Sequence, residues 1–279
     1  MTTLQKTVWL VTGCSSGLGK SFAKVLAQAG CLVFATARNI DSLTALKEAF
    51  PTQIYPLKLD VTHKEDIQQA VQTVISRAGR IDGLINNAGY CYRAAIEEGE
   101  EAGIQELFQT HVFGPAALMQ EVLPYMRRNR SGKIVNISSV AAITTLEGSG
   151  YYGAAKRALE GITSALQKEV SPLGITAMAV EPGAFRTDFS GRSLKESAVR
   201  IPDYEATAGL RRIENDHTHG TQCGDPNKSA RLIIQAVVSP NPPSVFILGG
   251  DAWDIYEQID AQRRSEMAPW LEESKQTCF

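Results

Sequence analysis

Near the N-terminus the chain reads Thr7-Val8-Trp9-Leu10-Val11-Thr12-Gly13-Cys14-Ser15-Ser16-Gly17-Leu18-Gly19, an apolar run followed directly by a glycine-rich turn. The apolar run is bounded by polar Lys6 and by the glycines, which predicts a buried strand. A helical pattern follows over residues 21–29, and a second, mostly apolar strand is expected over residues 31–37. This order of strand, turn, helix and strand predicts a βαβ unit.

The glycine-rich turn has the features of a dinucleotide-binding site. Residues without side chains let backbone N–H groups approach a pyrophosphate at the N-terminus of a helix. Because the strand and helix that such a motif needs are both present, we predict that the turn binds a nucleotide. The residues assigned to this role are Gly13, Ser15, Ser16, Gly17, Leu18 and Gly19.

The end of the second strand bears on the choice of cofactor. In NAD-preferring sites an acidic residue near this point binds the ribose 2′-hydroxyl, but the nearest acid here is Asp41, which we expect to cap the next helix. Arg38 instead offers a fixed cation for a 2′-phosphate, and Ser15 and Ser16 offer hydroxyl donors. The sequence therefore favours NADP(H) over NAD(H), unless Arg38 is only a solvated loop charge.

Strands and helices continue to alternate along the chain. Apolar runs predict strands at 53–59, 81–85, 133–137, 175–180 and 244–248, and helical spacing predicts helices at 41–50, 63–77, 101–128, 151–170 and 226–238. We expect Thr62 to cap the helix that follows it. Because short crossovers between parallel strands are right-handed, the pattern predicts a Rossmann-type α/β fold: a doubly wound, parallel, seven-stranded sheet with helices on both faces. We expect residues 1–279 to form one domain.

Polar residues and glycines gather where the predicted strands end. In parallel sheets, ligands bind beyond the carboxyl ends of the strands. Among these residues, Asn87, Ala88 and Gly89 are small enough for a backbone to lie close to a ligand. Such features come from separate parts of the chain, at residues 13–19, 38, 60–61, 87–89, 138–139 and 182–187.

Tyr152 and Lys156 lie four residues apart on a predicted helix and share a face. Such a pair arises by chance in about one chain of this length in two, so its weight comes from Ser139 at the end of the preceding strand. An ammonium nearby favours the phenolate and lowers the pKa of a phenol. We predict that Tyr152 protonates a carbonyl oxygen as hydride reaches the carbon. Lys156 is expected to tune Tyr152 and bind the nicotinamide ribose, and Ser139 to hydrogen-bond the substrate oxygen; otherwise they are a surface contact and a capping serine.

With these residues in place, the chain resembles the short-chain dehydrogenase/reductase family in its single-domain branch. The resemblance covers about residues 6–187 and rests on Thr12-Gly-x-x-x-Gly-x-Gly19, Asn87-Ala88-Gly89, Ser139, Tyr152-x-x-x-Lys156 and Pro182-Gly183. In motif detail it is most similar to hydroxysteroid and retinol dehydrogenase-like members and to bacterial carbonyl reductases. The resemblance implies an NADP(H)-dependent enzyme that interconverts a ketone or aldehyde and an alcohol, and a homodimer or homotetramer formed through helices 101–128 and 151–170.

The resemblance also assigns further residues to the cofactor. It places Asp60 and Val61 beside the adenine. It places Pro182, Gly183, Phe185 and Thr187 around the nicotinamide.

The chain departs from the family at His111. The family usually has Asn here, in a context like Asn-Val-x-Gly, and this Asn supports a water in the proton relay to the lysine. His111 either preserves that support through its backbone carbonyl, or crowds the relay, or adds a titration near its usual pKa of about 6.5. We therefore include His111 among the candidate catalytic residues.

The substrate side is expected after the sixth strand. Residues 188–224 lose periodicity, apart from helical patterns at 194–199 and 204–214, and are expected to form a lid with Phe185, Phe189, Leu194 and Tyr204 as apolar walls. On the opposite rim, Tyr90, Tyr92, Ile143 and Leu146 suggest an apolar pocket for an apolar substrate, although Arg93 is able to recognise an acid. A charged helical extension at 251–279 is expected to cover the core or the pocket mouth, or to contact a partner.

Composition narrows the remaining possibilities. The net charge of −2 gives no reason to expect nucleic acid or an acidic membrane, and no apolar run reaches the roughly 18 residues of a membrane span. The polar first residues do not resemble a secretory signal, and five cysteines without a CxxC pair favour a cytoplasmic protein. The closest histidines, His217 and His219, lie in a polar segment, and no metal is expected.

Two other functions stay open at this point. One is a non-catalytic or weakly active dinucleotide sensor or scaffold on the same fold, for which His111 is the only hint. The other is an epimerase or dehydratase of the extended branch, for which the chain is short and its glycine spacing different.

Overall fold

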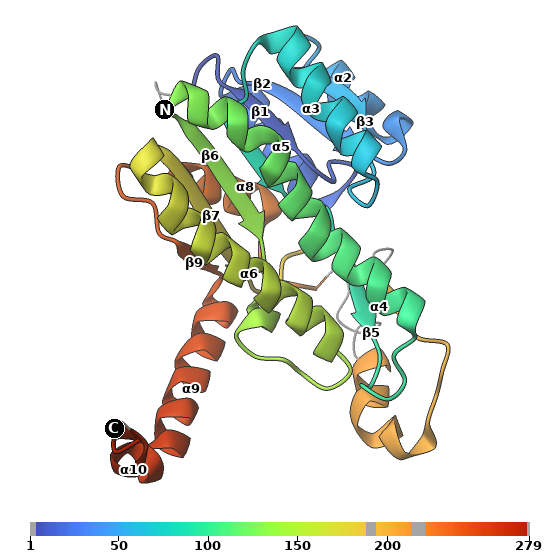
Figure 1. Ribbon diagram of the computed structural model, residues 1–279. Coiled ribbons are helices and arrows are strands. Elements are labelled where there is room, and N and C mark those ends of the chain that lie inside the picture. The colour runs from blue at the N-terminus through green and yellow to red at the C-terminus, as the bar shows by residue number, and fades with distance from the viewer. Residues whose placement is uncertain (1–3, 188–193, 214–220, 278–279) are drawn as a thin grey trace.

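A parallel sheet of seven strands forms the centre of the protein (Figure 1). The computed structural model describes residues 4–187, 194–213 and 221–277. The strands lie in the order β3-β2-β1-β4-β6-β7-β9. Their bounds are β1 (Val8–Val11), β2 (Leu32–Ala37), β3 (Ile54–Lys58), β4 (Gly83–Asn86), β6 (Gly132–Ile137), β7 (Ile175–Pro182) and β9 (Val245–Leu248). The predicted Rossmann-type fold is therefore confirmed.

Helices cover both faces of the sheet, because successive side chains of a strand point to opposite faces. Trp9 and Val11 of β1 pack in one core with α1, α2 and α8, whereas Val8 and Leu10 pack in a second core with α3, α5 and α6. A sheet buried on both faces needs strands that are apolar throughout, as β1 is. The helices are α1 (Gly17–Gln28), α2 (Thr44–Ala49), α3 (Lys64–Ala78), α5 (Gly114–Asn129), α6 (Gly150–Val170) and α8 (Pro226–Val237).

The strand order reverses between β1 and β4. From β1 the chain builds β2 and β3 toward one edge, and from β4 it builds β6, β7 and β9 toward the other. At such a switch point the connections leave in opposite directions, so a crevice remains at the carboxyl ends of the strands. The turn after β1 and the loop after β4 therefore flank this crevice.

The predicted helix over residues 41–50 begins differently. A 3₁₀ turn (Ile40–Leu43) precedes α2, and the residue that caps it is Asn39, not Asp41. The Asn39 side chain accepts a hydrogen bond from the Asp41 N–H at 3.0 Å. Asparagine forms this turn with the backbone two residues on, so the capping residue lies before the acid that the sequence favoured.

Thr62 does not cap α3, which corrects a second expectation. The N-cap of α3 is His63, and it makes no side-chain capping bond. The Thr62 hydroxyl instead donates a hydrogen bond to Asp60 Oδ1 at 2.7 Å. An acceptor two residues away thus competes successfully with the helix N-terminus.

The predicted helix over residues 101–128 is interrupted. α4 (Glu101–Phe108) passes through a π-helical turn (Gln109–Phe113) into α5. Apolar spacing does not reveal one extra residue in a turn, and such turns are frequent at functional sites. Gly114 follows the π turn, and a Cβ there would lie 2.4 Å from the Val61 carbonyl oxygen. The π turn places His111 in the interior, where it is 1% exposed.

A second, two-stranded parallel sheet pairs β5 (Cys91–Arg93) with β8 (Leu194–Glu196). The helical pattern expected at 194–199 is therefore wrong, because pairing with β5 outweighs local propensity. In the second expected helical stretch, a 3₁₀ turn (Pro202–Tyr204) and a π turn (Glu205–Gly209) replace a regular start. Residues 188–193 and 214–220 of the expected lid, which include Phe189, lie outside the described residues.

The C-terminal extension is helical, as expected. α9 (Gly250–Met267) projects away from β9 and leads into α10 (Leu271–Lys275) (Figure 1). Its first turn packs on the body, with Ala252 fully buried, whereas Trp253, Met267 and Trp270 are exposed. In the described ranges, no helix is both long and apolar enough to cross a membrane.

Candidate active site

A cavity of about 550 Å³ lies at the carboxyl ends of the strands. Its wall brings together Gly13, Ser15, Ser16, Gly17, Leu18, Arg38, Asp60, Val61, Asn87, Ala88, Gly89, Ser139, Tyr152, Lys156, Pro182, Gly183, Phe185 and Thr187. These are the candidate residues that the sequence placed at strand ends, except Gly19 and His111, which lie behind the wall. The cavity thus collects residues from almost every crossover of the sheet.

The glycine turn adopts a backbone that requires glycine. Gly13 has a φ of +69°, which L side chains rarely adopt, and a Cβ there would lie 2.8 Å from the Ala88 Cα. Gly19 packs against the same turn, since its Cβ would lie 2.1 Å from the Gly13 carbonyl oxygen. The turn therefore keeps its backbone on the cavity and directs the start of α1 toward it, as a pyrophosphate site requires.

Thr12 and Asn87 fasten this turn to the end of β4. Thr12 Oγ1 accepts hydrogen bonds from the N–H groups of Asn87 and Ala88, both at 2.9 Å. In return, Asn87 Nδ2 donates to the Thr12 carbonyl oxygen at 2.9 Å. Thr12 and Asn87 thus hold the two sides of the switch-point crevice together. Both belong to the sequence motifs, but the motifs alone did not indicate this role.

Arg38 lies at one end of the cavity, where its side chain is exposed on the wall. Asp60 lies near it. Burial acts to raise the pKa of the Asp60 carboxyl, but hydrogen bonds from Thr62 and the charges of His63 and Arg38 hold that pKa below its usual value. A cation and two serines of the turn therefore share this end with an ionised acid.

Sequence reasoning missed a group of residues on the cavity wall that includes Glu106, Thr110, Lys195 and Gln222. Lys195 Nζ donates to both carboxylate oxygens of Glu106 at 2.7 Å, and it lies 4.6 Å from the centre of the Tyr90 ring. This pair links β8 to α4 across the side of the cavity. In a strand, Lys195 points to the opposite face from Leu194 and Glu196, and this alternation could have identified it. Because the segment was expected to be helical, that signal was missed.

Ser139, Tyr152 and Lys156 meet at the inner end of the cavity. The side chains of Tyr152 and Ser139 are hydrogen-bonded. Ser139 Oγ also accepts a hydrogen bond from the Ala141 N–H at 3.1 Å, so this serine caps a turn as well. Lys156 Nζ donates to the Ile137 carbonyl oxygen at 2.7 Å and lies 5.7 Å from the centre of the Tyr152 ring.

Burial sets the electrostatics of this group. Tyr152 and Lys156 are 6% and 5% exposed. Burial raises the pKa of Tyr152, with the hydrogen bond from Ser139 and the charge of Arg93 acting against it. Burial lowers the pKa of Lys156 to about 7, against the opposing charge of Glu160. The expectation that Lys156 lowers the pKa of Tyr152 is therefore wrong here, because removal from water disfavours the charged form of both groups.

His111 packs behind Tyr152. Its ring meets the Tyr152 ring edge-on, with centroids 5.5 Å apart. Its Nε2 lies 2.7 Å from the carbonyl oxygen and 3.2 Å from the backbone N of Tyr90, and the tautomer decides which of the two it bonds. Burial and the charge of Lys156 hold the pKa of His111 well below its usual value. A titration near pH 6.5 is therefore not expected, and His111 is a neutral packing partner of Tyr152 in this structure.

A second cavity, of about 170 Å³, lies on the other side of Ser139 and Tyr152. Its wall consists of Cys91, Arg93, Ser139, Val140, Ala141, Thr144, Leu146, Ser149, Tyr152, Leu194, Arg211 and Ile255. Both of the residues expected to hold the substrate oxygen therefore border two cavities.

Only some of the residues expected to form substrate walls line a cavity. Leu194 and Leu146 line the smaller cavity, and Tyr90 and Phe185 line the larger. Tyr204 lines neither; its hydroxyl donates to Glu97 at 2.8 Å. Two others point elsewhere, since Tyr92 accepts a hydrogen bond from the Glu100 N–H and Ile143 is buried. Ile255 of α9 borders the smaller cavity, so the C-terminal extension covers part of it.

A family model described as short chain dehydrogenase matches residues 7–198. The chain is 36% identical over 243 residues to 3-ketodihydrosphingosine reductase of Bacteroides thetaiotaomicron, which covers 86% of this chain and 87% of that relative. A solved short-chain dehydrogenase from Streptomyces avermitilis shares 39% identity and a TM-score of 0.91 over 98% of both chains. The chain therefore belongs to the short-chain dehydrogenase/reductase family and is an oxidoreductase, as its motifs predict.

The fold extends to more distant members. A short-chain dehydrogenase/reductase from Burkholderia phymatum, solved in complex with NAD, has a TM-score of 0.82 at 19% identity over 94% of this chain and 97% of that one. Among the residues that the structure describes, no group of three or more His, Cys, Asp or Glu side chains is arranged to hold a metal ion.

Proposed function

We propose that the protein uses NADP(H) to interconvert a ketone or aldehyde and an alcohol, with Tyr152 as the general acid and base. The observation that carries this proposal is that Ser139 and Tyr152 border both cavities. The wall of the larger cavity includes the glycine turn at the start of α1, which fits the pyrophosphate of a dinucleotide. The smaller one has room for a compact substrate, so a carbonyl oxygen between the cavities would meet both side chains.

The residues of the site supply the proton chemistry. When bound, the cofactor supplies the hydride. Ser139 and Tyr152 hold the carbonyl oxygen, and the raised pKa of Tyr152 keeps its phenol protonated and ready to donate. Lys156, with a pKa of about 7, exchanges a proton with its surroundings at neutral pH. In the direction of alcohol oxidation, Tyr152 accepts the proton instead.

Further residues of the larger cavity would hold the cofactor. Asp60 and Val61 are assigned to the adenine, Asn87, Ala88 and Gly89 to the ribose side, and Pro182, Gly183, Phe185 and Thr187 to the nicotinamide. Arg38, with the hydroxyls of Ser15 and Ser16, supports NADP(H) over NAD(H), because a guanidinium pairs well with a 2′-phosphate.

The test is a panel of ketones, aldehydes and oxo acids with NADPH and with NADH, followed by the loss of the reduced cofactor's absorbance. We expect turnover of at least one carbonyl compound, faster with NADPH. Faster turnover with NADH would contradict the role of Arg38. If neither cofactor is oxidised with any compound, the protein is better described as a dinucleotide sensor.

A further inference from the structure

The smaller cavity carries positive charge on its wall. Among its described lining residues are two arginines, Arg93 and Arg211, and no aspartate or glutamate. The rest of the wall is apolar or carries hydroxyl groups. A largely apolar cavity with a few placed polar groups is typical of a small-molecule site, in which those groups set specificity.

The strand β5 directs Arg93 into this cavity. Cys91 and Arg93 lie two residues apart and share one face of the strand, whereas the Tyr92 hydroxyl reaches the Glu100 N–H on the other face. The Arg93 Nε is buried and has no hydrogen-bond partner. The charge of Arg93 is also close enough to oppose the rise in the pKa of Tyr152. A half-buried cation with a buried, unpartnered Nε therefore lies beside the proposed proton donor.

Arg211 belongs to the same electrostatic environment. Burial raises the pKa of the Cys91 thiol, and the charges of Arg93 and Arg211 both act against that rise. The two guanidinium groups thus act on one buried atom from β5 and from the segment after the Glu205–Gly209 turn. An anion in the cavity would meet both of them.

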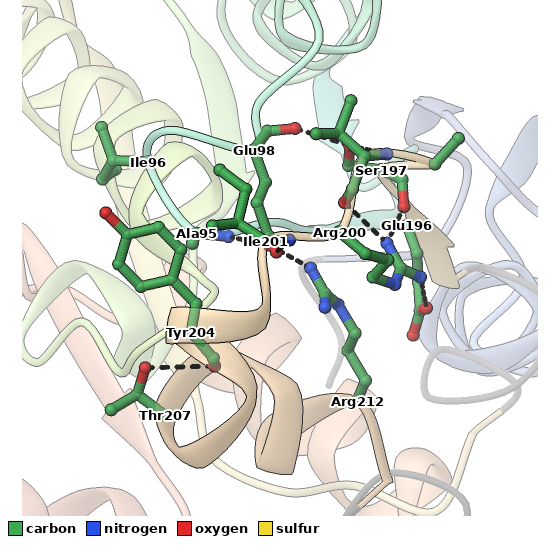
Figure 2. Close-up of polar contacts among 12 residues, drawn as sticks. Ala95, Ile96, Glu98, Glu196, Ser197, Arg200, Ile201, Tyr204, Thr207 and Arg212 are labelled. Carbon is green, nitrogen blue, oxygen red and sulfur yellow. Dashed lines mark hydrogen bonds and ion pairs between the residues drawn. The ribbon is translucent and has the colours of Figure 1, made fainter.

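The acids near this cavity already have arginine partners (Figure 2). Glu98, whose side chain is fully buried, is ion-paired with Arg212 and accepts hydrogen bonds from the N–H groups of Ala95 and Ile201. Glu196, opposite Arg93 in the β5–β8 register, is paired with Arg200 at 2.9 Å. Neither carboxylate therefore forms an ion pair with Arg93 among the described residues.

A second unsatisfied polar group borders the same cavity. Ser149 is 3% exposed, and its Oγ has no hydrogen-bond partner. It directly precedes α6, so the positive end of a long helix dipole lies on this wall too. A buried hydroxyl without a partner is costly, and an acidic ligand would accept its hydrogen.

We propose that the substrate is a compact carbonyl compound with an acidic group, an oxo acid, whose carboxylate is bound by Arg93 and Arg211 while its carbonyl oxygen faces Ser139 and Tyr152. The inference rests on the proposed function for the carbonyl end and on the cavity wall for the acidic end. The cavity of about 170 Å³ is close in size to the roughly 150 Å³ that holds one benzene molecule. The acidic recognition revises the apolar pocket that the sequence indicated.

Binding tests the anion site without requiring turnover. Acetoacetate and levulinate, each beside its methyl ester, are titrated into the NADP⁺-loaded protein by calorimetry. The acids are expected to bind, and Arg93→Gln is expected to weaken them about 10- to 100-fold while leaving the esters unchanged, as for the loss of one charge-assisted hydrogen bond. Arg93→Lys, which keeps the charge, is expected to restore part of the affinity.

Exposed Arg127 of α5 provides the matched control, since Arg127→Gln removes a charge far from the cavity wall. It should bind the acids like the parent. Equal binding of acids and esters, no binding of either acid, or an Arg93→Gln variant that binds acids like the parent would overturn the anion site.

Turnover separates this inference from the proposed function. If the acids bind through Arg93 but no carbonyl compound of the panel is reduced with NADPH or NADH, the anion site stands and the proposed function is contradicted. If neutral ketones are reduced faster than oxo acids, and Arg93→Gln does not change that rate, the proposed function stands and the anion site is contradicted.

Discussion

At the scale of single residues, burial decides the chemistry of the site. Tyr152, Lys156 and His111 are each less than a tenth exposed. Burial keeps the phenol protonated and the imidazole neutral, and it brings the pKa of Lys156 to about 7. The spacing of Tyr152 and Lys156 and the departure of His111 from the family pattern identified these residues. The direction in which each pKa shifts could not be predicted, because it depends on removal from water by distant segments.

Burial of neutral His111 predicts how the free energy of unfolding depends on pH. The unfolded chain binds a proton at this histidine below a pKa of about 6.5, but the folded chain does not, so acid favours unfolding. Between about pH 7.5 and pH 5.5, the parent should lose stability more steeply than His111→Asn. The difference in slope approaches about 1.4 kcal/mol per pH unit at the acid end. Urea unfolding at a series of pH values measures it.

The control for this series is Gln69→Asn, which replaces an exposed residue of α3 that has no titratable group. This variant should unfold with the parent's pH dependence. If His111→Asn and the parent have the same slope, the histidine is not held neutral by the fold. An inflection of the rate near pH 6.5 that His111→Asn removes would contradict the same assignment.

At the scale of elements, regular strands and helices could be predicted, and irregular ones could not. Apolar runs located all seven strands of the main sheet, because strands buried on both faces are continuously apolar. The π turn at Gln109–Phe113 and strand β8 could not be predicted. The π turn depends on the tertiary packing of His111, and β8 depends on pairing with β5. Lys195 and Arg211 were not predicted as site residues, because they lie in such irregular segments. Arg93 was predicted, because it lies next to other residues of the expected pocket rim.

Glu98 anchors the segment that follows β8, and this role can be tested. This carboxylate holds the Ile201 and Ala95 N–H groups and the nearly buried Arg212 (Figure 2). Glu98→Gln leaves the Arg212 charge without its partner, so we expect a loss of about 3 kcal/mol, at the low end for a broken buried ion pair. Hydrogen exchange should rise at the Ile201 amide before it rises in the central sheet.

The neighbouring acid provides a matched control. Glu97 is exposed and accepts one hydrogen bond from the Tyr204 hydroxyl. Glu97→Gln should change stability by no more than about 0.5 kcal/mol. If both variants behave alike, Glu98 does not organise this segment.

At the scale of the whole molecule, topology assembles the site. Residues between 13 and 187 meet at one edge because every strand of the sheet is parallel and ends there. The convergence could be predicted from sequence, since it follows from strand order alone. The division into two cavities, with Ser139 and Tyr152 between them, could not, because β5, β8 and α9 build the second cavity from segments without a clear pattern.

The central claim is that Tyr152 is the proton donor shared by both cavities. The most direct measurement is kcat for Tyr152→Phe with the best substrate of the panel, taken beside the Kd for NADPH. Phenylalanine keeps the ring that packs on His111 and removes only the hydroxyl. We predict that kcat falls by about 10²–10⁴-fold, the usual contribution of general acid catalysis, while the Kd for NADPH stays nearly the same. A variant that keeps the parent's kcat would contradict the account.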